Sequence, residues 1–156
     1  MLYLAVVALT MFILPIGSVT AEHVFYAGEP LLWLAGKWFV FWGVGVRLTL
    51  AGARQVMQPE FTAREIFHME SSEALPLVRE LGIANLATGV VGILSLRAPS
   101  FVLPVAISAG IFYGIAGFRH IAERGRSGNE TVAMVSDLWI FAVLAAFVCA
   151  FVRAAN

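Results

Sequence analysis

This sequence is poor in the residues from which most catalytic and metal-binding sites are built. It has one cysteine, Cys149, and three histidines. A lone cysteine excludes an intramolecular disulfide and a cysteine metal cluster, and three histidines are too few for a histidine-rich iron centre. The 10 Lys and Arg residues balance the 10 Asp and Glu residues, so no basic surface for nucleic acid is indicated. We therefore predict no metal, no cofactor and no nucleic-acid partner.

Recognisable catalytic motifs are also absent from the sequence. It contains no phosphate-binding loop, no dinucleotide-binding glycine motif and no His-Glu-x-x-His zinc motif. The spacing Glu65-x-x-His68 is typical of helical di-iron proteins, but those proteins use two such motifs, and no second copy is present. An enzyme therefore has no positive signature here.

Apolar residues dominate the chain instead. Hydrophobic residues make up 60% of it and charged residues only 13%, whereas average soluble domains have about 25% charged residues. A helix needs roughly 20 mainly apolar residues to cross a bilayer, and every backbone polar group needs a partner within lipid. We predict an all-α membrane protein, a bundle of five transmembrane helices forming one domain over residues 1–156. The five apolar runs are Leu2–Thr20, Leu31–Ala51, Leu75–Leu96, Phe101–Phe118 and Thr131–Val152.

Two segments allow alternatives. The first apolar run has the look of a signal peptide, but no Lys or Arg precedes it, so we predict a retained span and leave open whether residues 1–21 are processed. Between the second and third spans, residues 58–72 mix apolar and charged side chains, and Thr62-x-x-Glu65 has the spacing of a capping box. A short interfacial helix and a folded polar loop fit this segment equally well.

The distribution of Lys and Arg predicts the orientation. With five spans, one side of the membrane receives six of these basic residues and the other side three. Because cytoplasmic loops are enriched in Lys and Arg, we predict an inner-membrane protein with a cytoplasmic N-terminus and an external C-terminus. The six are Arg54, Arg64, Arg79, Arg119, Arg124 and Arg126, and the three are Lys37, Arg97 and Arg153.

Four polar residues on four different apolar runs lie at nearly the same predicted depth. Each is six or seven residues from a basic or polar segment end on the predicted cytoplasmic side, which is roughly 9–10 Å of helix. Polar side chains are costly in hydrocarbon and usually face a partner or a cavity. The layer therefore predicts either one site or one structural cluster. Its members are Arg47, Asn85, Tyr113 and Asp137.

Glu80 and His120 are predicted to lie nearer the same membrane surface. Glu80 belongs to a small, polar row on the third span, and His120 belongs to a glycine-rich face of the fourth. Small residues let helices approach closely, within one chain or between copies of it, so a homo-oligomer is a further expectation. The row is Glu80, Ala84, Thr88 and Gly92, flanked by Asn85 and Gly89, and the face on the fourth span is Gly110, Tyr113, Gly117 and His120.

Asp137 is the most informative single residue of the set. Its candidate partners are Arg47, Arg119 and His120. A structural salt bridge and a role toward a proton, an ion or a ligand both fit an intramembrane carboxylate. Arg47 has its own alternative, since a long arginine side chain can extend to the lipid headgroups.

The stretch at residues 80–94, beginning Glu-Leu-Gly-Ile-Ala-Asn-Leu, resembles a family of small bacterial integral membrane proteins catalogued as a domain of unknown function. The Ile-Phe-Tyr-Gly stretch at 111–114 and Arg-His-Ile at 119–121 resemble the end of that family's fourth helix. The resemblance covers residues 55–150 and implies a multi-span inner-membrane helical protein without implying an activity. The layout is also distantly similar to DoxX-type four-helix membrane proteins, which is a likeness of architecture and not of function.

Three functions are consistent with these patterns. The first is binding of a lipid, small amphiphile or ion in a polar cavity in the cytoplasmic half of the bundle. The second is a structural or partner-binding subunit in which the same residues only join helices, and the third is a membrane enzyme with a carboxylate–histidine acid/base pair. A cavity of about 300 Å³ or more favours the first function, whereas a dry, paired core favours the second. The candidate ligand-binding residues are Arg47, Glu80, Asn85, Tyr113, His120 and Asp137.

Overall fold

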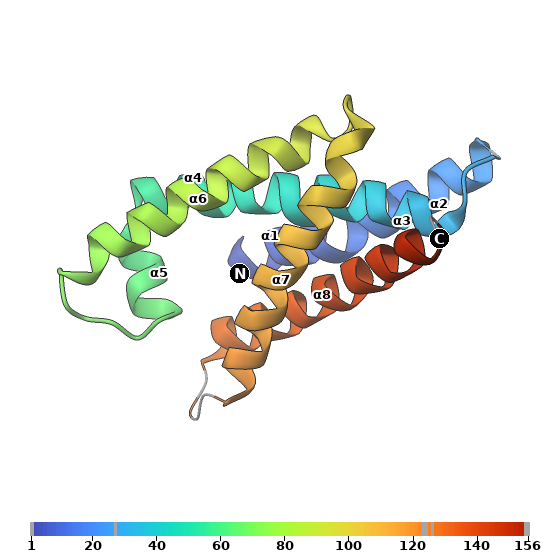
Figure 1. Ribbon diagram of the computed structural model, residues 1–156. Coiled ribbons are helices and arrows are strands. Elements are labelled where there is room, and N and C mark those ends of the chain that lie inside the picture. The colour runs from blue at the N-terminus through green and yellow to red at the C-terminus, as the bar shows by residue number, and fades with distance from the viewer. Residues whose placement is uncertain (1, 27, 123–124, 126, 155–156) are drawn as a thin grey trace.

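The computed structural model describes residues 2–26, 28–122, 125 and 127–154, and its regular elements in these ranges are all helices (Figure 1). Five of these helical stretches are long and apolar enough to cross a membrane, so the predicted fold class is confirmed. Several extend past the predicted apolar runs, because polar residues continue a helix beyond its hydrocarbon-length core. The five stretches are Leu2–Phe25, Leu31–Met57, Ala74–Leu94, Pro99–Ala122 and Gly128–Ala154.

The first two stretches each contain a π-helical segment, a widened form of helix that is frequent at functional sites. The other three are α6 (Ala74–Leu94), α7 (Val102–Ala122) after a short 3₁₀ turn, η3 (Pro99–Phe101), and α8 (Gly128–Ala154). The first stretch consists of α1 (Leu2–Ala8), η1 (Leu9–Ile13) and α2 (Leu14–Phe25), and the second of α3 (Leu31–Phe39), η2 (Val40–Val46) and α4 (Arg47–Met57).

A short helix, α5 (Pro59–Glu65), follows the second stretch, as one of the two alternatives for this segment expected. The predicted capping box at Thr62 and Glu65 is wrong, because Thr62 lies inside α5 and Gln58 precedes its first residue. Pro59 explains the earlier start, since proline fits the first helical position, where no backbone N–H partner is needed. The orientation stays a prediction, and two of its basic residues, Arg124 and Arg126, lie outside the described residues.

Glycines allow α6 to lie against the second stretch with backbone in contact with backbone. A Cβ atom added at Gly52 would lie 2.5 Å from the carbonyl oxygen of Gly82, and one at Gly45 would lie 2.7 Å from the carbonyl carbon of Gly92. Real Cβ atoms do not approach backbone so closely, so only glycine fits these positions. The helix pair α4–α6 is therefore held by its small residues, as close packing in membranes requires.

The buried face of α6 differs from the row that the sequence indicated. Glu80 and Ala84 of that row are exposed, and the Thr88 hydroxyl donates a hydrogen bond to the carbonyl of Ala84 in its own helix, at 3.0 Å. The expected small-residue face is confirmed for Asn85, Gly89 and Gly92, whereas Glu80 and Ala84 do not belong to it. The residues that face the second stretch are Gly82, Asn85, Gly89 and Gly92, all of them buried.

The predicted face of α7 is confirmed, since Gly110, Tyr113, Gly117 and His120 are all buried. This helix packs along α8, with the side chain of Leu138 against Gly117. The chain thus forms two close pairs, α4–α6 and α7–α8, which diverge toward α5 (Figure 1). A hydrophobic core joins the pairs away from α5, and it includes Val40, Val44, Val102, Ile140, Leu144 and Phe147.

We predict that Gly52→Ala lowers the thermal unfolding temperature of the purified protein, because the added methyl group meets the Gly82 carbonyl at 2.5 Å. Overpacking of this kind destabilises a protein by about 1–3 kcal/mol. Gly17→Ala is the matched control, since nothing lies within 4 Å of its added Cβ. Equal unfolding temperatures for the two variants would contradict the close approach of α4 and α6.

Candidate functional site

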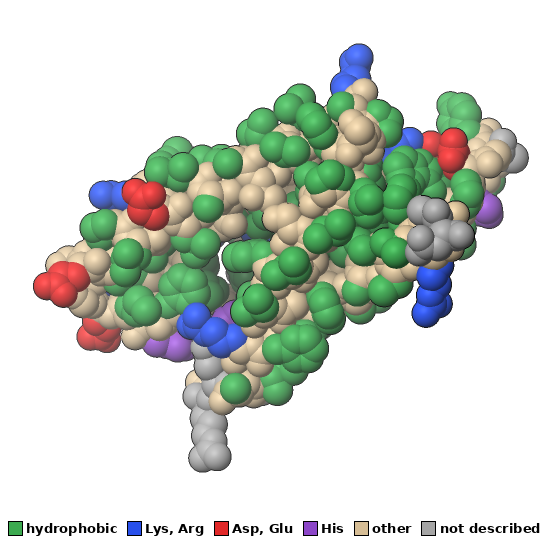
Figure 2. Space-filling model, viewed as in Figure 1, with side chains coloured by type: hydrophobic (Ala, Val, Ile, Leu, Met, Phe, Trp, Pro, Cys, Tyr) green, Lys and Arg blue, Asp and Glu red, His purple; other side chains and the backbone are tan. Residues whose placement is uncertain are grey.

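A cavity of about 700 Å³ lies where the two helix pairs diverge. Figure 2 shows a hollow in this face of the molecule, between the positions of α6 and α7 in Figure 1. Its walls come from α1, α4, α5, α6, α7 and α8, and from the segment that follows α5. The volume lies within the range of about 300–1,000 Å³ that is usual for small-molecule sites.

Five of the six predicted site residues line this cavity, and they come from four different helices. They are Arg47, Asn85, Tyr113, His120 and Asp137. Glu80 does not line it and is exposed on another face of α6. The next residue, Leu81, does line the cavity, and a step of one residue turns an α-helix by about 100°. The predicted layer is thus brought together in space, with Glu80 turned away from it.

Arg47 and Asp137 face the cavity without pairing with each other. Within the described ranges, neither residue forms an ion pair with an N···O distance of 4.0 Å or less. The Arg47 guanidinium carbon lies 5.7 Å from the centre of the Tyr3 ring, and the buried Nε atom has no hydrogen-bond partner. The salt bridge considered for Asp137 is therefore not formed, and Arg47 retains a donor that nothing satisfies.

Two other members of the layer are engaged in joining helices. The Asn85 amide donates a hydrogen bond from Nδ2 to Oε1 of Gln55 at 2.8 Å, which links α6 to α4. The Tyr113 hydroxyl donates a hydrogen bond to the backbone carbonyl of Gly43 at 2.8 Å, which links α7 to the π-helical segment η2. A structural role fits these two residues, because each polar group is satisfied within the protein.

The remaining walls of the cavity are largely apolar. A second arginine, Arg54, lies with its guanidinium carbon 3.6 Å from the centre of the Phe61 ring, in a cation–π contact with α5. The cavity thus combines a small number of charged groups with a hydrocarbon surface. The apolar residues that line it include Leu2, Val6, Leu48, Leu50, Leu81, Phe112 and Ile115.

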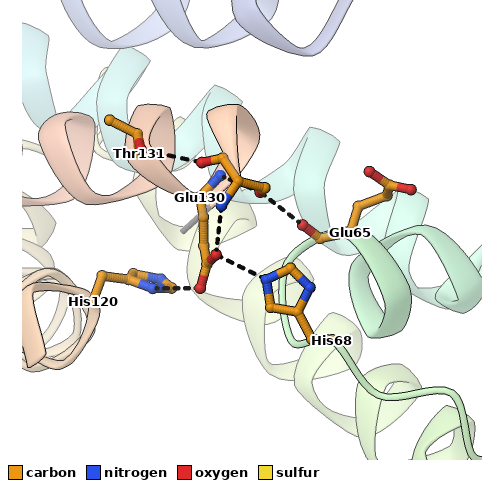
Figure 3. A network of polar contacts seen from close by, with 6 residues as sticks. Glu65, His68, His120, Glu130 and Thr131 are labelled. Atoms are coloured by element: carbon orange, nitrogen blue, oxygen red, sulfur yellow. Dashed lines mark hydrogen bonds and ion pairs between the residues drawn. The ribbon is translucent and has the colours of Figure 1, made fainter. Parts of the chain in front are cut away.

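A polar network centred on Glu130 lies beside this cavity (Figure 3). Oε2 of the buried Glu130 lies 2.8 Å from Nε2 of His68, and Oε1 lies 3.8 Å from Nδ1 of His120. The Ser127 N–H donates to Oε2 of Glu130 at 3.1 Å, and the Glu130 N–H donates to Oγ of Ser127 at 3.2 Å. This reciprocal pair is a capping box at the start of α8.

The Glu130 network fixes one wall of the cavity. His68 belongs to the segment after α5, and its two preceding residues, Ile66 and Phe67, line the cavity. The contact between His68 and Glu130 therefore ties this segment to the start of α8. No group of three or more His, Cys, Asp or Glu residues in the described ranges is arranged to hold a metal ion.

Sequence reasoning missed Glu130 as part of the site. A signal was present, because Ser127-x-x-Glu130 has capping-box spacing directly before the last apolar run. Gln55 was also missed, and it gave no signal, since only the fold places it opposite Asn85.

We predict that Glu130→Ala speeds amide hydrogen exchange in residues 61–69 and lowers the unfolding temperature. The loss of a capping side chain destabilises a helix start by about 1 kcal/mol, and loss of the His68 contact releases the segment from α8. Glu70→Ala is the control, because Glu70 is exposed. Unchanged exchange in residues 61–69 of the Glu130 variant would contradict this role.

Comparison with known proteins gives a family but no characterised relative. No curated protein and no solved structure matches the chain. One family model, described as "Family of unknown function (DUF6790)", matches residues 1–156, a longer region than the resemblance seen in the sequence. The bacterial origin, the Glu-Leu-Gly-x-Ala-Asn-Leu motif and the DoxX likeness stay predictions. The chain belongs to this family of unknown function, DUF6790.

Proposed function

We propose that this protein binds a lipid or small amphiphile in the cavity between its helix pairs. The observation that carries the proposal is the buried Nε of Arg47, which lacks a partner beside a cavity of about 700 Å³. An intramembrane charge without a protein partner is expensive and marks a functional position. With the predicted orientation, the cavity lies in the cytoplasmic half of an inner-membrane protein.

The size and lining of the cavity favour an amphiphile over a bare ion. A water molecule takes up about 30 Å³ of liquid, so a cavity of about 700 Å³ is far larger than a single ion needs. Its apolar walls suit a hydrocarbon chain, whereas Arg47 and Asp137 suit a polar headgroup. An ion alone would leave the apolar walls unused.

The two alternative functions receive less support from the geometry. A purely structural role accounts for Asn85 and Tyr113, which join helices, but it leaves the buried Nε of Arg47 without a hydrogen-bond partner.

A Glu80–His120 pair, one candidate for the carboxylate–histidine pair of an enzyme, is not formed. Glu80 is exposed and lies outside the cavity that His120 lines. The carboxylate that does lie near His120, that of Glu130, is engaged by His68 and by the Ser127 N–H.

We predict that Ala116→Trp lowers the amount of lipid that co-purifies with the protein in mild detergent several-fold. Ala116 lines the cavity, and an indole at this position would fill part of it. The measurement is mass spectrometry of the lipids extracted from equal amounts of folded protein. Ala142→Trp is the control, because Ala142 is exposed on α8 outside the cavity. Equal lipid content in the two variants and the wild type would refute binding in the cavity.

A further inference from the structure

The charged groups that line the cavity are unequal in sign. Among the described residues that line it are three arginines, Arg47, Arg54 and Arg119, and one carboxylic acid, Asp137. Arg54 is engaged with the Phe61 ring, and Arg119 interacts with other parts of the protein. Arg47 on α4 also has a ring contact, with Tyr3, but its buried Nε has no hydrogen-bond partner. Within the described ranges neither Arg47 nor Asp137 on α8 forms an ion pair, so these two residues are the candidates to meet a ligand.

Arg47 has the geometry of an anion-binding group. A guanidinium has five N–H donors in a planar fork, and it pairs with a phosphate or carboxylate through two parallel hydrogen bonds. Arg47 lines the cavity, its Nε is buried without a hydrogen-bond partner, and the residue forms no ion pair within the described ranges. An anionic group in the cavity would pair with the guanidinium and neutralise a charge that is otherwise costly at this depth.

Asp137 adds a second requirement. A carboxyl group accepts hydrogen bonds through its carbonyl oxygen in either protonation state, so Asp137 offers an acceptor to an N–H or O–H donor. Because Asp137 and Arg47 face one cavity without pairing, a headgroup that carries both kinds of group would satisfy each of them. An anion alone would leave the acceptor oxygen of Asp137 without a hydrogen-bond donor.

We infer that the ligand is an amphiphile whose headgroup carries an anionic group, held by Arg47, next to a hydrogen-bond donor, held by Asp137. This inference rests on the proposed function and narrows its ligand class. A phospholipid with a hydroxyl or ammonium group beyond its phosphate has this chemistry. Its hydrocarbon part lies against the apolar walls that Leu48, Leu81 and Ile115 contribute.

The test is a titration of the full-length protein in detergent, with bound lipid counted by native mass spectrometry. Chain-matched phosphatidylglycerol and phosphatidylethanolamine carry both the phosphate and a donor. Phosphatidylcholine carries the phosphate without a donor, diacylglycerol carries a hydroxyl without a phosphate, and glycerol phosphate carries the headgroup without chains. We expect the first two lipids to bind about tenfold or more tightly than the other three probes, which corresponds to about 1.4 kcal/mol.

Variants of Arg47 and Asp137 test which residue binds the anionic group and which binds the hydrogen-bond donor. Arg47→Gln is expected to reduce the affinity for all three phospholipids to that for diacylglycerol, with Arg47→Lys intermediate because an ammonium keeps the charge without the fork. Asp137→Leu is expected to abolish the preference for phosphatidylglycerol over phosphatidylcholine. Arg64→Gln, at an exposed position outside the cavity, is the matched control and should bind as the wild type does.

Distinct outcomes separate the failure of this inference from that of the proposed function. If phosphatidylcholine and diacylglycerol bind as tightly as phosphatidylglycerol, the headgroup assignment is wrong and binding of an amphiphile stands. If glycerol phosphate binds as tightly as phosphatidylglycerol, the site takes a soluble phosphate and the amphiphile class is wrong. If no lipid binds the wild type more tightly than Ala116→Trp, both proposals are refuted.

Discussion

Backbone contact between α6 and the second membrane stretch is the constraint on which the cavity depends. Gly45 and Gly52 meet Gly92 and Gly82 closely. A methyl group at Gly45, Gly52 or Gly92 would collide with backbone, and one at Gly82 would collide with the Gln55 side chain. The two helices therefore stay together along their length, while α7 stays with α8. Because each pair is close-packed by itself and the pairs diverge toward α5, the space between them remains open as a cavity (Figure 1).

The polar layer divides into two parts with different physical roles. Asn85 donates a hydrogen bond to Gln55, and Tyr113 donates one to the Gly43 carbonyl. These two bonds hold the walls of the cavity in place. The side chains of Arg47 and Asp137 line the cavity. In a low-dielectric surrounding, hydrogen-bonded polar groups make the structure more rigid, whereas a polar group without a hydrogen-bond partner costs free energy. The first part builds the site, and the second part gives the site its chemistry.

Features that depend on local sequence pattern were predicted correctly, whereas side-chain directions and partners that depend on helix packing were not. The lengths of the apolar runs were enough to predict the five membrane-length helices. The equal depth of Arg47 and Asp137 was enough to predict that they lie at one place, which is the cavity. Depth does not report the direction in which a side chain points, so Glu80 was included among the candidate site residues although its helix turns it away from the cavity. The partnership of Asn85 with Gln55 follows from helix packing, which no spacing in the sequence reveals.

The central claim is that the cavity between the helix pairs holds a lipid, and photo-crosslinking in membranes tests it most directly. A phospholipid with a photoreactive group near its headgroup is activated in vesicles that contain the protein, and the labelled peptides are mapped by mass spectrometry. The account predicts labelling concentrated at residues 47–55 and 112–120, which line the cavity, and loss of that labelling in the Ala116→Trp variant. Labelling that is spread evenly over the lipid-facing helix surfaces, and that the variant leaves unchanged, would contradict it.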